Sequence, residues 1–275
     1  MRFVLFALLA LGSCADATRT APGPEQPDVL PYRLDAPDAV IALSSELTET
    51  SALTVLPSGR LGTLQDETGT LYEIDPATGA VVDRLVFDGA GDFEGLELAG
   101  DAVWALRSDG DLFRLARDST GTPTARKVET PLKSRNDTEG LAYDAANHRL
   151  LVACKEWPGH DLDDVRAIYA FDLATETMAE RPVYLLDQAA VDTDLRFRPS
   201  ALAIHPATGQ IYVLSSVRRA IAVLDPDGTL LGVADLHLDA APQPEGIAFA
   251  ADGTLYISSE GTTGPGTLLR FAPTR

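Results

Sequence analysis

Five short segments of the 275-residue chain begin with a glutamate or a serine and continue into the same apolar pattern. Three of them read Glu-Gly-Leu or Glu-Gly-Ile, and the other two read Ser-Ala-Leu. Their first residues, the anchors, are Ser51, Glu94, Glu139, Ser200 and Glu245. Carboxylates that are gathered in one place repel one another unless a cation or a proton lies among them. The anchors therefore point to cation binding or to acid–base chemistry.

The donor set contains oxygen only. The four histidines fall in turns or loops at unrelated positions, so we do not expect a zinc site. Carboxylate, hydroxyl and carbonyl oxygens suit a hard cation, and a roomy site suits Ca²⁺ better than Mg²⁺. We therefore predict a calcium site formed by Glu94, Glu139 and Glu245. The alternative is that each Glu hydrogen-bonds the backbone of the next repeat and serves as a clasp without an ion.

The spacing of the anchors indicates how they are held. Successive anchors are 43, 45, 61 and 45 residues apart. A period of about 40–50 residues is typical of a β-propeller blade with four strands. A second motif also recurs five times: Leu71-Tyr-Glu-Ile, Leu112-Phe-Arg-Leu, Ile168-Tyr-Ala-Phe, Ile221-Ala-Val-Leu and Leu268-Leu-Arg-Phe. We therefore predict an all-β, five-bladed β-propeller.

The longest gap between anchors leaves a six-bladed propeller as the alternative. We prefer five blades because two insertions absorb the extra length: a polar loop at 157–166 and a segment at 187–198 that contains a single helical turn. The four strands of this third unit are predicted at 140–144, 149–155, 167–173 and 178–186. The last unit has only three strands, so we expect a strand within 28–43 to complete it and to hide its edge.

The first strand of a blade lies nearest the propeller axis. The five anchors should therefore surround one mouth of the central channel. Asp92 and Asp137 precede two of them and should point towards the same mouth. The ends of the second strands offer a further set of polar residues at this mouth: Glu67, Asp109, Glu156, Ser216 and Glu260.

The N-terminus predicts a secreted, lipid-anchored protein. An apolar run at 3–11 is too short to span a bilayer and is typical of a signal peptide. It ends in Leu11-Gly-Ser-Cys14, which resembles a bacterial lipobox, so we expect a signal peptide at 1–13 and lipidation of Cys14. Ala15 favours the outer membrane, facing the periplasm. Residues 14–36 are predicted to be a flexible tether and 37–275 the propeller.

Charge and cysteine content restrict the partners. The formal net charge of −19 argues against nucleic acid, which requires clustered Lys and Arg. We expect a monomer that meets the membrane through its lipid anchor only. Cys154, the other cysteine, lies within a predicted strand without a local activating base, so we expect it to be a buried apolar residue.

The repeats resemble a known family. Asp92-Phe-Glu-Gly-Leu, Asn136-Asp-Thr-Glu-Gly-Leu-Ala-Tyr-Asp and the segment from Gln243 to Glu260 are similar to the SdiA-regulated family of bacterial β-propellers, over residues 40–272. The resemblance implies a five-bladed propeller with a calcium site and no established reaction. Related Glu-Gly-Leu-Ala repeats occur in propellers described as esterase-like or phytase-like.

Three functions remain open from the sequence. The first is a lipid-anchored binding or scaffold module in the bacterial cell envelope, with a calcium site on its axis and an unidentified small-molecule or protein ligand. The second is a metal-dependent hydrolase of phosphoesters, esters or lactones at the same mouth, with Glu156 or Glu260 as general base. No Gly-x-Ser-x-Gly motif and no basic cluster supports it. The third is a structural propeller without an ion.

Overall fold

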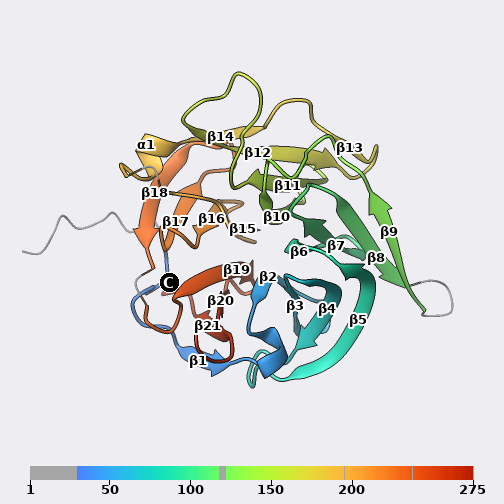
Figure 1. Cartoon of the computed structure of the whole chain (residues 1–275). Helices are drawn as coiled ribbons and strands as arrows, with labels where there is room; N and C mark the ends of the chain where they lie inside the picture. The colour runs from blue at the N-terminus through green and yellow to red at the C-terminus, as the bar shows by residue number, and fades with distance from the viewer. Residues whose placement is uncertain (1–29, 118–121, 195, 237, 275) are drawn as a thin grey trace, which may run out of the picture.

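The computed structural model describes residues 30–117, 122–194, 196–236 and 238–274. Five antiparallel sheets are arranged around a central axis (Figure 1), so the chain is a five-bladed β-propeller, as the repeat spacing predicts. The predicted signal peptide and Cys14 lie outside the described residues. No helix in the described part of the chain has both the length and the apolar character needed to cross a membrane.

The blades follow one another along the chain. Blade 1 contains β2 (Thr50–Val55), β3 (Leu61–Gln65), β4 (Thr68–Ile74) and β5 (Val81–Ala90). Blade 2 contains β6 (Phe93–Ala99), β7 (Ala102–Arg107), β8 (Leu112–Arg117) and β9 (Pro123–Val128). Blade 3 contains β10 (Thr138–Asp144), β11 (Arg149–Cys154), β12 (Val165–Asp172), β13 (Thr177–Met178) and β14 (Tyr184–Asp187). Blade 4 contains β15 (Ala201–Ile204), β16 (Ile211–Ser215), β17 (Ala220–Leu224) and β18 (Leu230–Asp235).

Blade 5 joins the two ends of the described chain. It contains β19 (Gln243–Phe249), β20 (Leu255–Glu260), β21 (Thr267–Phe271) and β1 (Ala39–Ala42). The β1 strand pairs antiparallel with β21, and the peptide N–H of Asp38 donates to Arg270 O at 2.8 Å. A short 3₁₀ helix, η1 (Ser45–Leu47), then leads into β2.

The segment just before β1 packs on the propeller. Leu30, Tyr32 and Leu34 are buried in an apolar cluster that also contains Tyr212. The hydroxyl of Tyr32 donates to Gly253 O at 2.6 Å. These residues fall in the range for which a tether is predicted. Their alternating apolar side chains explain why the described fold includes residues 30–36.

Blade 3 differs from the predicted pattern at its outer edge. The predicted strand at 178–186 is split, because β13 and β14 pair with opposite ends of β12. Pro182 lies between them and has no peptide N–H to donate to the sheet. The predicted helical turn follows directly as α1 (Gln188–Val191), and the Asp187 side chain caps it by accepting from Ala190 N at 3.0 Å.

The core lies between the blades, where alternate strand residues pack. Trp104 of β7 and Phe171 of β12, for example, have ring centroids 5.7 Å apart across blades 2 and 3. Cys154 is fully buried beside them and is a free thiol, and burial raises its pKa to about 12. It is therefore the inert apolar residue that the sequence predicts.

Candidate functional site

The anchors lie at the start of the innermost strands, and four of them are held by β-bulges. The strand register shifts at Ser51, Glu94, Glu139 and Glu245, so that each of these residues is an extra residue in its strand. A bulge interrupts the alternation of side chains and redirects the inserted residue. Ser200, the fifth anchor, comes immediately before β15. We call the end of the axis that carries the five anchors the acidic mouth.

The glycine after each anchor glutamate is required by close packing between blades. A Cβ on Gly95 would lie 2.8 Å from Leu141 Cβ in the next blade, and one on Gly140 would lie 2.7 Å from Leu202 Cγ. Gly246 meets blade 1 in the same way. The Glu-Gly-Leu repeat therefore has a structural meaning: Gly leaves room for the aliphatic side chain of the following blade.

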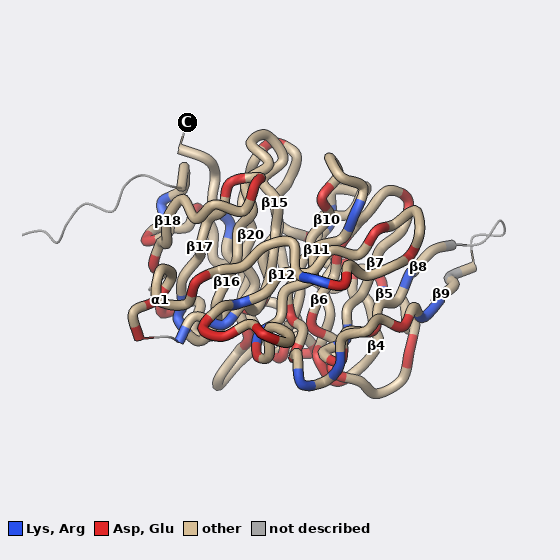
Figure 2. The backbone as a smooth tube through the Cα atoms, turned by 90° about the horizontal axis from the view of Figure 1, so that it is seen from above, with Lys and Arg blue, Asp and Glu red and all other residues tan. Residues whose placement is uncertain are grey.

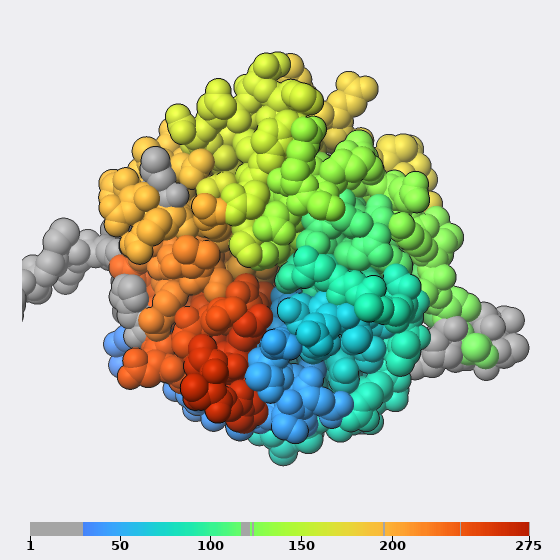
Figure 3. Space-filling view, viewed as in Figure 1, coloured from blue at the N-terminus to red at the C-terminus, as the bar shows by residue number. Residues whose placement is uncertain are grey.

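These aliphatic side chains form a layer directly below the anchors. The layer takes one buried residue from each blade: Leu53, Leu96, Leu141, Leu202 and Ile247. The cavity that they share with the anchors has a volume of only ≈ 10 Å³. The aliphatic layer therefore closes the channel beneath the acidic mouth. Figure 3 looks along the axis and shows the five blades meeting at the centre.

The three anchor glutamates share one electrostatic environment. Burial raises the pKa of Glu94 far above its usual range, and the charges of Glu139, Asp92 and Glu245 raise it further. Burial also raises the pKa of Glu139 and that of Glu245. These carboxyls therefore lie close enough for the charges of Glu139 and Glu245 to act on Glu94. Figure 2, which views the propeller from its rim, shows several acidic residues near the middle of the lower face, with Lys and Arg among them.

A lysine lies among these carboxylates. The ammonium of Lys155, directly after β11, forms an ion pair with Glu139, whose side chain is 6% exposed. Burial opposes the charged form of Lys155, yet Glu139 and Asp137 raise its pKa. The same ammonium lowers the pKa values of Glu139 and Glu245, against the effect of burial. Lys155 is not among the residues predicted for the mouth, although it stands just before Glu156, which is.

The two serine anchors connect neighbouring blades. Ser51 Oγ donates to Phe93 O at 2.6 Å, which joins blade 1 to blade 2. Ser200 Oγ donates to Pro244 O at 3.3 Å and accepts from Ser216 N at 3.1 Å. Both hydroxyls are buried and already engaged with the backbone. The clasp is predicted for the glutamates, and the structure shows contacts between blades at the two serine anchors as well.

Two residues from the ends of the second strands approach the anchors. Ser216 hydrogen-bonds Glu245 and lowers its pKa against the effect of burial. Burial and the nearby charges of Glu245 and Asp66 raise the pKa of Glu260 to about 7. The side-chain amide of Gln243 donates to the Glu260 carboxylate. Blade 5 therefore contributes a second carboxyl group, that of Glu260, beside Glu245.

The other three predicted residues have different surroundings. Glu67 is exposed in the turn between β3 and β4. Asp109 is paired with Arg107, with Arg107 Nη2 at 2.7 Å from its carboxylate. Glu156 is paired with Arg198. The structure therefore does not bring these side chains into the carboxylate group on the axis.

The fit of a metal ion can be judged from these contacts. The oxygen donors and the mutual repulsion of Glu94, Glu139 and Glu245 suit a hard cation. Within the residues that the structure describes, however, no three His, Cys, Asp or Glu side chains are grouped so as to enclose an ion. Lys155 is paired with Glu139 instead. An ion can be held only if these side chains turn towards it and Lys155 leaves Glu139.

Comparisons with known proteins agree with the fold. A family model described as SdiA-regulated matches residues 32–265, in line with the resemblance of the repeats. A crystal structure of glutaminyl cyclase from Myxococcus xanthus is similar with a TM-score of 0.61 and 16% identity, covering 86% of this chain and 95% of that one. A gluconolactonase from Xanthomonas campestris has a TM-score of 0.54 and 16% identity, covering 81% and 72%. The PQQ-bound aldose sugar dehydrogenase from Streptomyces coelicolor has a TM-score of 0.50 and 15% identity, covering 86% and 99%. At these identities the likeness shows the shared fold.

Proposed function

This chain belongs to the SdiA-regulated family, and we propose that it is a binding propeller whose acidic mouth holds a cation. Ca²⁺ is the ion that an oxygen donor set of this kind suits best. The bound ion would complete a surface for a ligand that carries oxygen atoms. The family and the fold give the architecture, and the carboxylates on the axis are the residues that would bind the ion.

One observation carries the proposal: the carboxylate charge at the mouth exceeds its compensation. On top of the effect of burial, the charges of Glu139 and Glu245 raise the pKa of Glu94, and the charge of Glu245 raises that of Glu139. The single ammonium of Lys155 cannot neutralise three carboxylates. Buried carboxylates without a counter-charge bind protons instead. A divalent cation would replace those protons.

The residues that would hold the ion follow from the same contacts. Glu94 and Glu245 are its first candidates, because neither forms an ion pair with a Lys or Arg within the described residues. Glu139 would join them after its ammonium partner moves away. Ca²⁺ accepts six to eight oxygen ligands in flexible geometry, so it tolerates such a rearrangement better than Mg²⁺ does.

Calorimetric titration of Ca²⁺ into chelator-treated protein tests this proposal. We expect binding, a rise in melting temperature, and proton release that appears as different heats in buffers of different ionisation enthalpy. Glu94→Gln and Glu245→Gln should each weaken binding at least about tenfold. Glu180→Gln, at an exposed position of blade 3, is the matched control. Absence of both heat and thermal stabilisation in the unmodified protein would exclude the calcium site.

A second candidate function is hydrolysis at the same mouth, and one observation favours it. Burial and Glu139 raise the pKa of Glu94 to about 11, whereas Lys155 limits the rise at Glu139, whose pKa is about 8. Two neighbouring carboxyl groups whose pKa values differ in this way can serve as general acid and general base. Generic ester, lactone and phosphoester substrates, with and without Ca²⁺, test this function. Turnover that survives Glu139→Gln unchanged would show that the mouth is not catalytic.

We also propose that lipidated Cys14 holds the propeller at the outer membrane, facing the periplasm. The support is the lipobox-like Leu11-Gly-Ser-Cys14 after a short apolar run. Metabolic labelling with a fatty acid, followed by membrane fractionation, tests the anchor. Labelling should be lost in Cys14→Ser, and a variant that still carries the label would contradict this assignment.

A further inference from the structure

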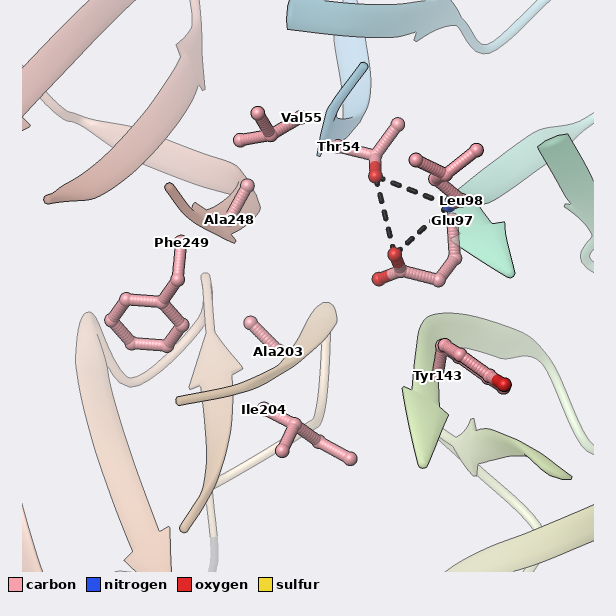
Figure 4. A pocket seen from close by; sticks show the side chains of 9 residues that line it. All are labelled: Thr54, Val55, Glu97, Leu98, Tyr143, Ala203, Ile204, Ala248 and Phe249. Atoms are coloured by element: carbon pink, nitrogen blue, oxygen red, sulfur yellow. Dashed lines mark hydrogen bonds between the residues drawn. The ribbon is translucent and has the colours of Figure 1, made fainter. Parts of the chain in front are cut away.

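The opposite end of the axis has a cavity of its own. The innermost strands of all five blades end around a space of ≈ 140 Å³ (Figure 4). Each blade contributes to its wall, with Thr54, Glu97, Tyr143, Ile204 and Phe249 among the lining residues. We call this end the Glu97 mouth. The aliphatic layer on the axis lies between it and the acidic mouth, so the two ends are separate sites.

Glu97 is the one charged residue among those that line this space. Figure 4 shows the Glu97 carboxylate turned towards the open centre, where Val55, Ala248 and Ala203 lie across from it. Its Oε1 atom accepts from Leu98 N at 2.9 Å and from Thr54 Oγ1 at 3.2 Å. The backbone of Tyr143 in blade 3 also hydrogen-bonds the carboxylate, so blades 1, 2 and 3 together hold it in one orientation.

No basic side chain compensates this carboxylate. Among the described residues, no Lys, Arg or His forms an ion pair with Glu97. The hydroxyl of Tyr143, another lining residue, is 3.2 Å from His148 Nδ1 and points away from the centre in Figure 4. A buried carboxylate is costly without a cation or a proton. Burial accordingly raises the pKa of Glu97 to about 8.

We propose that the Glu97 mouth binds a small organic cation, a primary ammonium on a short apolar chain. The ammonium would donate to the Glu97 carboxylate from the open centre, and the chain would lie against Ile204 and Phe249. The cavity volume admits only a few non-hydrogen atoms, which excludes a peptide or a sugar chain. One carboxylate is too few for a metal ion, which takes several oxygen ligands. The net charge of −19 attracts cations to the molecule.

This inference does not depend on the calcium proposal, because it concerns the other end of the axis. Its test uses n-butylammonium as the probe and n-butanol as the uncharged analogue of the same length. Isotope-labelled protein is titrated with each probe, and backbone amide shifts are followed by NMR. The Leu98 amide is the reporter, since it donates directly to the Glu97 carboxylate. We expect a saturable shift of this amide with n-butylammonium and none with n-butanol.

Two conservative variants assign the binding. Glu97→Gln keeps the shape of the side chain and removes its charge, and it should weaken n-butylammonium binding at least about tenfold. Glu180→Gln removes an exposed carboxylate of blade 3 and should leave the affinity unchanged. Equal shifts with both probes, equal affinity in Glu97→Gln, or no shift at Leu98 in the unmodified protein would each overturn the proposal. The last measurement does not depend on whether Glu97→Gln folds.

Discussion

The Lys155 ammonium pairs with the Glu139 carboxylate in the middle of a group of like-charged side chains. The pair lies at the acidic mouth, where the third blade begins. It explains how the chain tolerates Glu139 in a nearly buried position. Any cation that enters the mouth therefore competes with the Lys155 ammonium for Glu139.

Removal of that ammonium should destabilise the protein. In Lys155→Met, Glu139 keeps its burial and its acidic neighbours but loses its compensating charge. Breaking a buried pair on one side costs about 3 kcal/mol. Urea denaturation at neutral pH, with a chelator present, measures this loss. Lys155→Arg keeps the charge and should recover most of the stability, and equal stability of all three proteins would contradict the role assigned to the pair.

Stability without divalent cations should fall as the pH rises. The pKa values of Glu94, Glu139 and Glu245 are raised above those of the unfolded chain, so the folded protein binds more protons than the unfolded one between these values. The contribution of these groups to stability is greatest below about pH 4.5, the usual pKa of Glu, and is lost progressively above it. Melting temperatures from pH 5 to pH 9 in a chelator should show this decline.

Ca²⁺ should reduce the decline, because it stabilises the ionised carboxylates. Glu94→Gln should reduce it as well, since the amide does not titrate. A melting temperature that falls equally in Glu94→Gln and in the unmodified protein would show that other groups cause the pH dependence.

The glycine that follows an anchor should tolerate no larger residue. In Gly140→Ala the new Cβ would lie 2.7 Å from Leu202 Cγ and 3.2 Å from the backbone N of Leu202, so the neighbouring blade must shift. Overpacking of this kind costs about 1–3 kcal/mol. Chemical denaturation compares the unfolding free energy of Gly140→Ala with that of Gly89→Ala, where no atom lies within 4 Å of the new Cβ. Similar unfolding free energies for the two variants would remove the packing explanation of the Glu-Gly-Leu repeat.

The sequence predicts the five-bladed architecture well because the same strand pattern occurs five times in it. The anchor spacing and the recurring third strand specify the blade number, and the polar segment after 186 specifies the α1 turn. The split between β13 and β14 is not predicted, although Pro182 marks its position. Leu30 and Tyr32 fall both in the predicted tether at 14–36 and in the range 28–43 for the closing strand, because their short apolar alternation lies in a proline-rich segment.

The site is predicted only in part, because equivalent positions do not carry equivalent side chains. Strand alternation places Lys155 and Glu156 on opposite sides, and only the structure shows that the lysine is the one that faces the anchors. Glu97 is not among the predicted site residues, although the repeat distinguishes its position. It stands three residues after its anchor, where the other blades have Thr54, Ala142, Ala203 and Ala248. A charged residue at a position where the other blades have small residues indicates the Glu97 mouth.

The serine anchors allow the clasp and the ligand roles to be separated by one substitution. Ser51→Ala removes the hydroxyl that donates to Phe93 O at 2.6 Å and leaves that carbonyl without this donor. The expected loss of stability is about 1 kcal/mol, because the hydrogen bond is buried. If Ser51 acts only as a clasp, Ca²⁺ affinity should stay the same, whereas Glu94→Gln in the next blade should lower it. Calorimetry and urea denaturation on both variants give the two quantities, and a Ser51→Ala protein that keeps its stability but loses affinity would assign the hydroxyl to the ion instead.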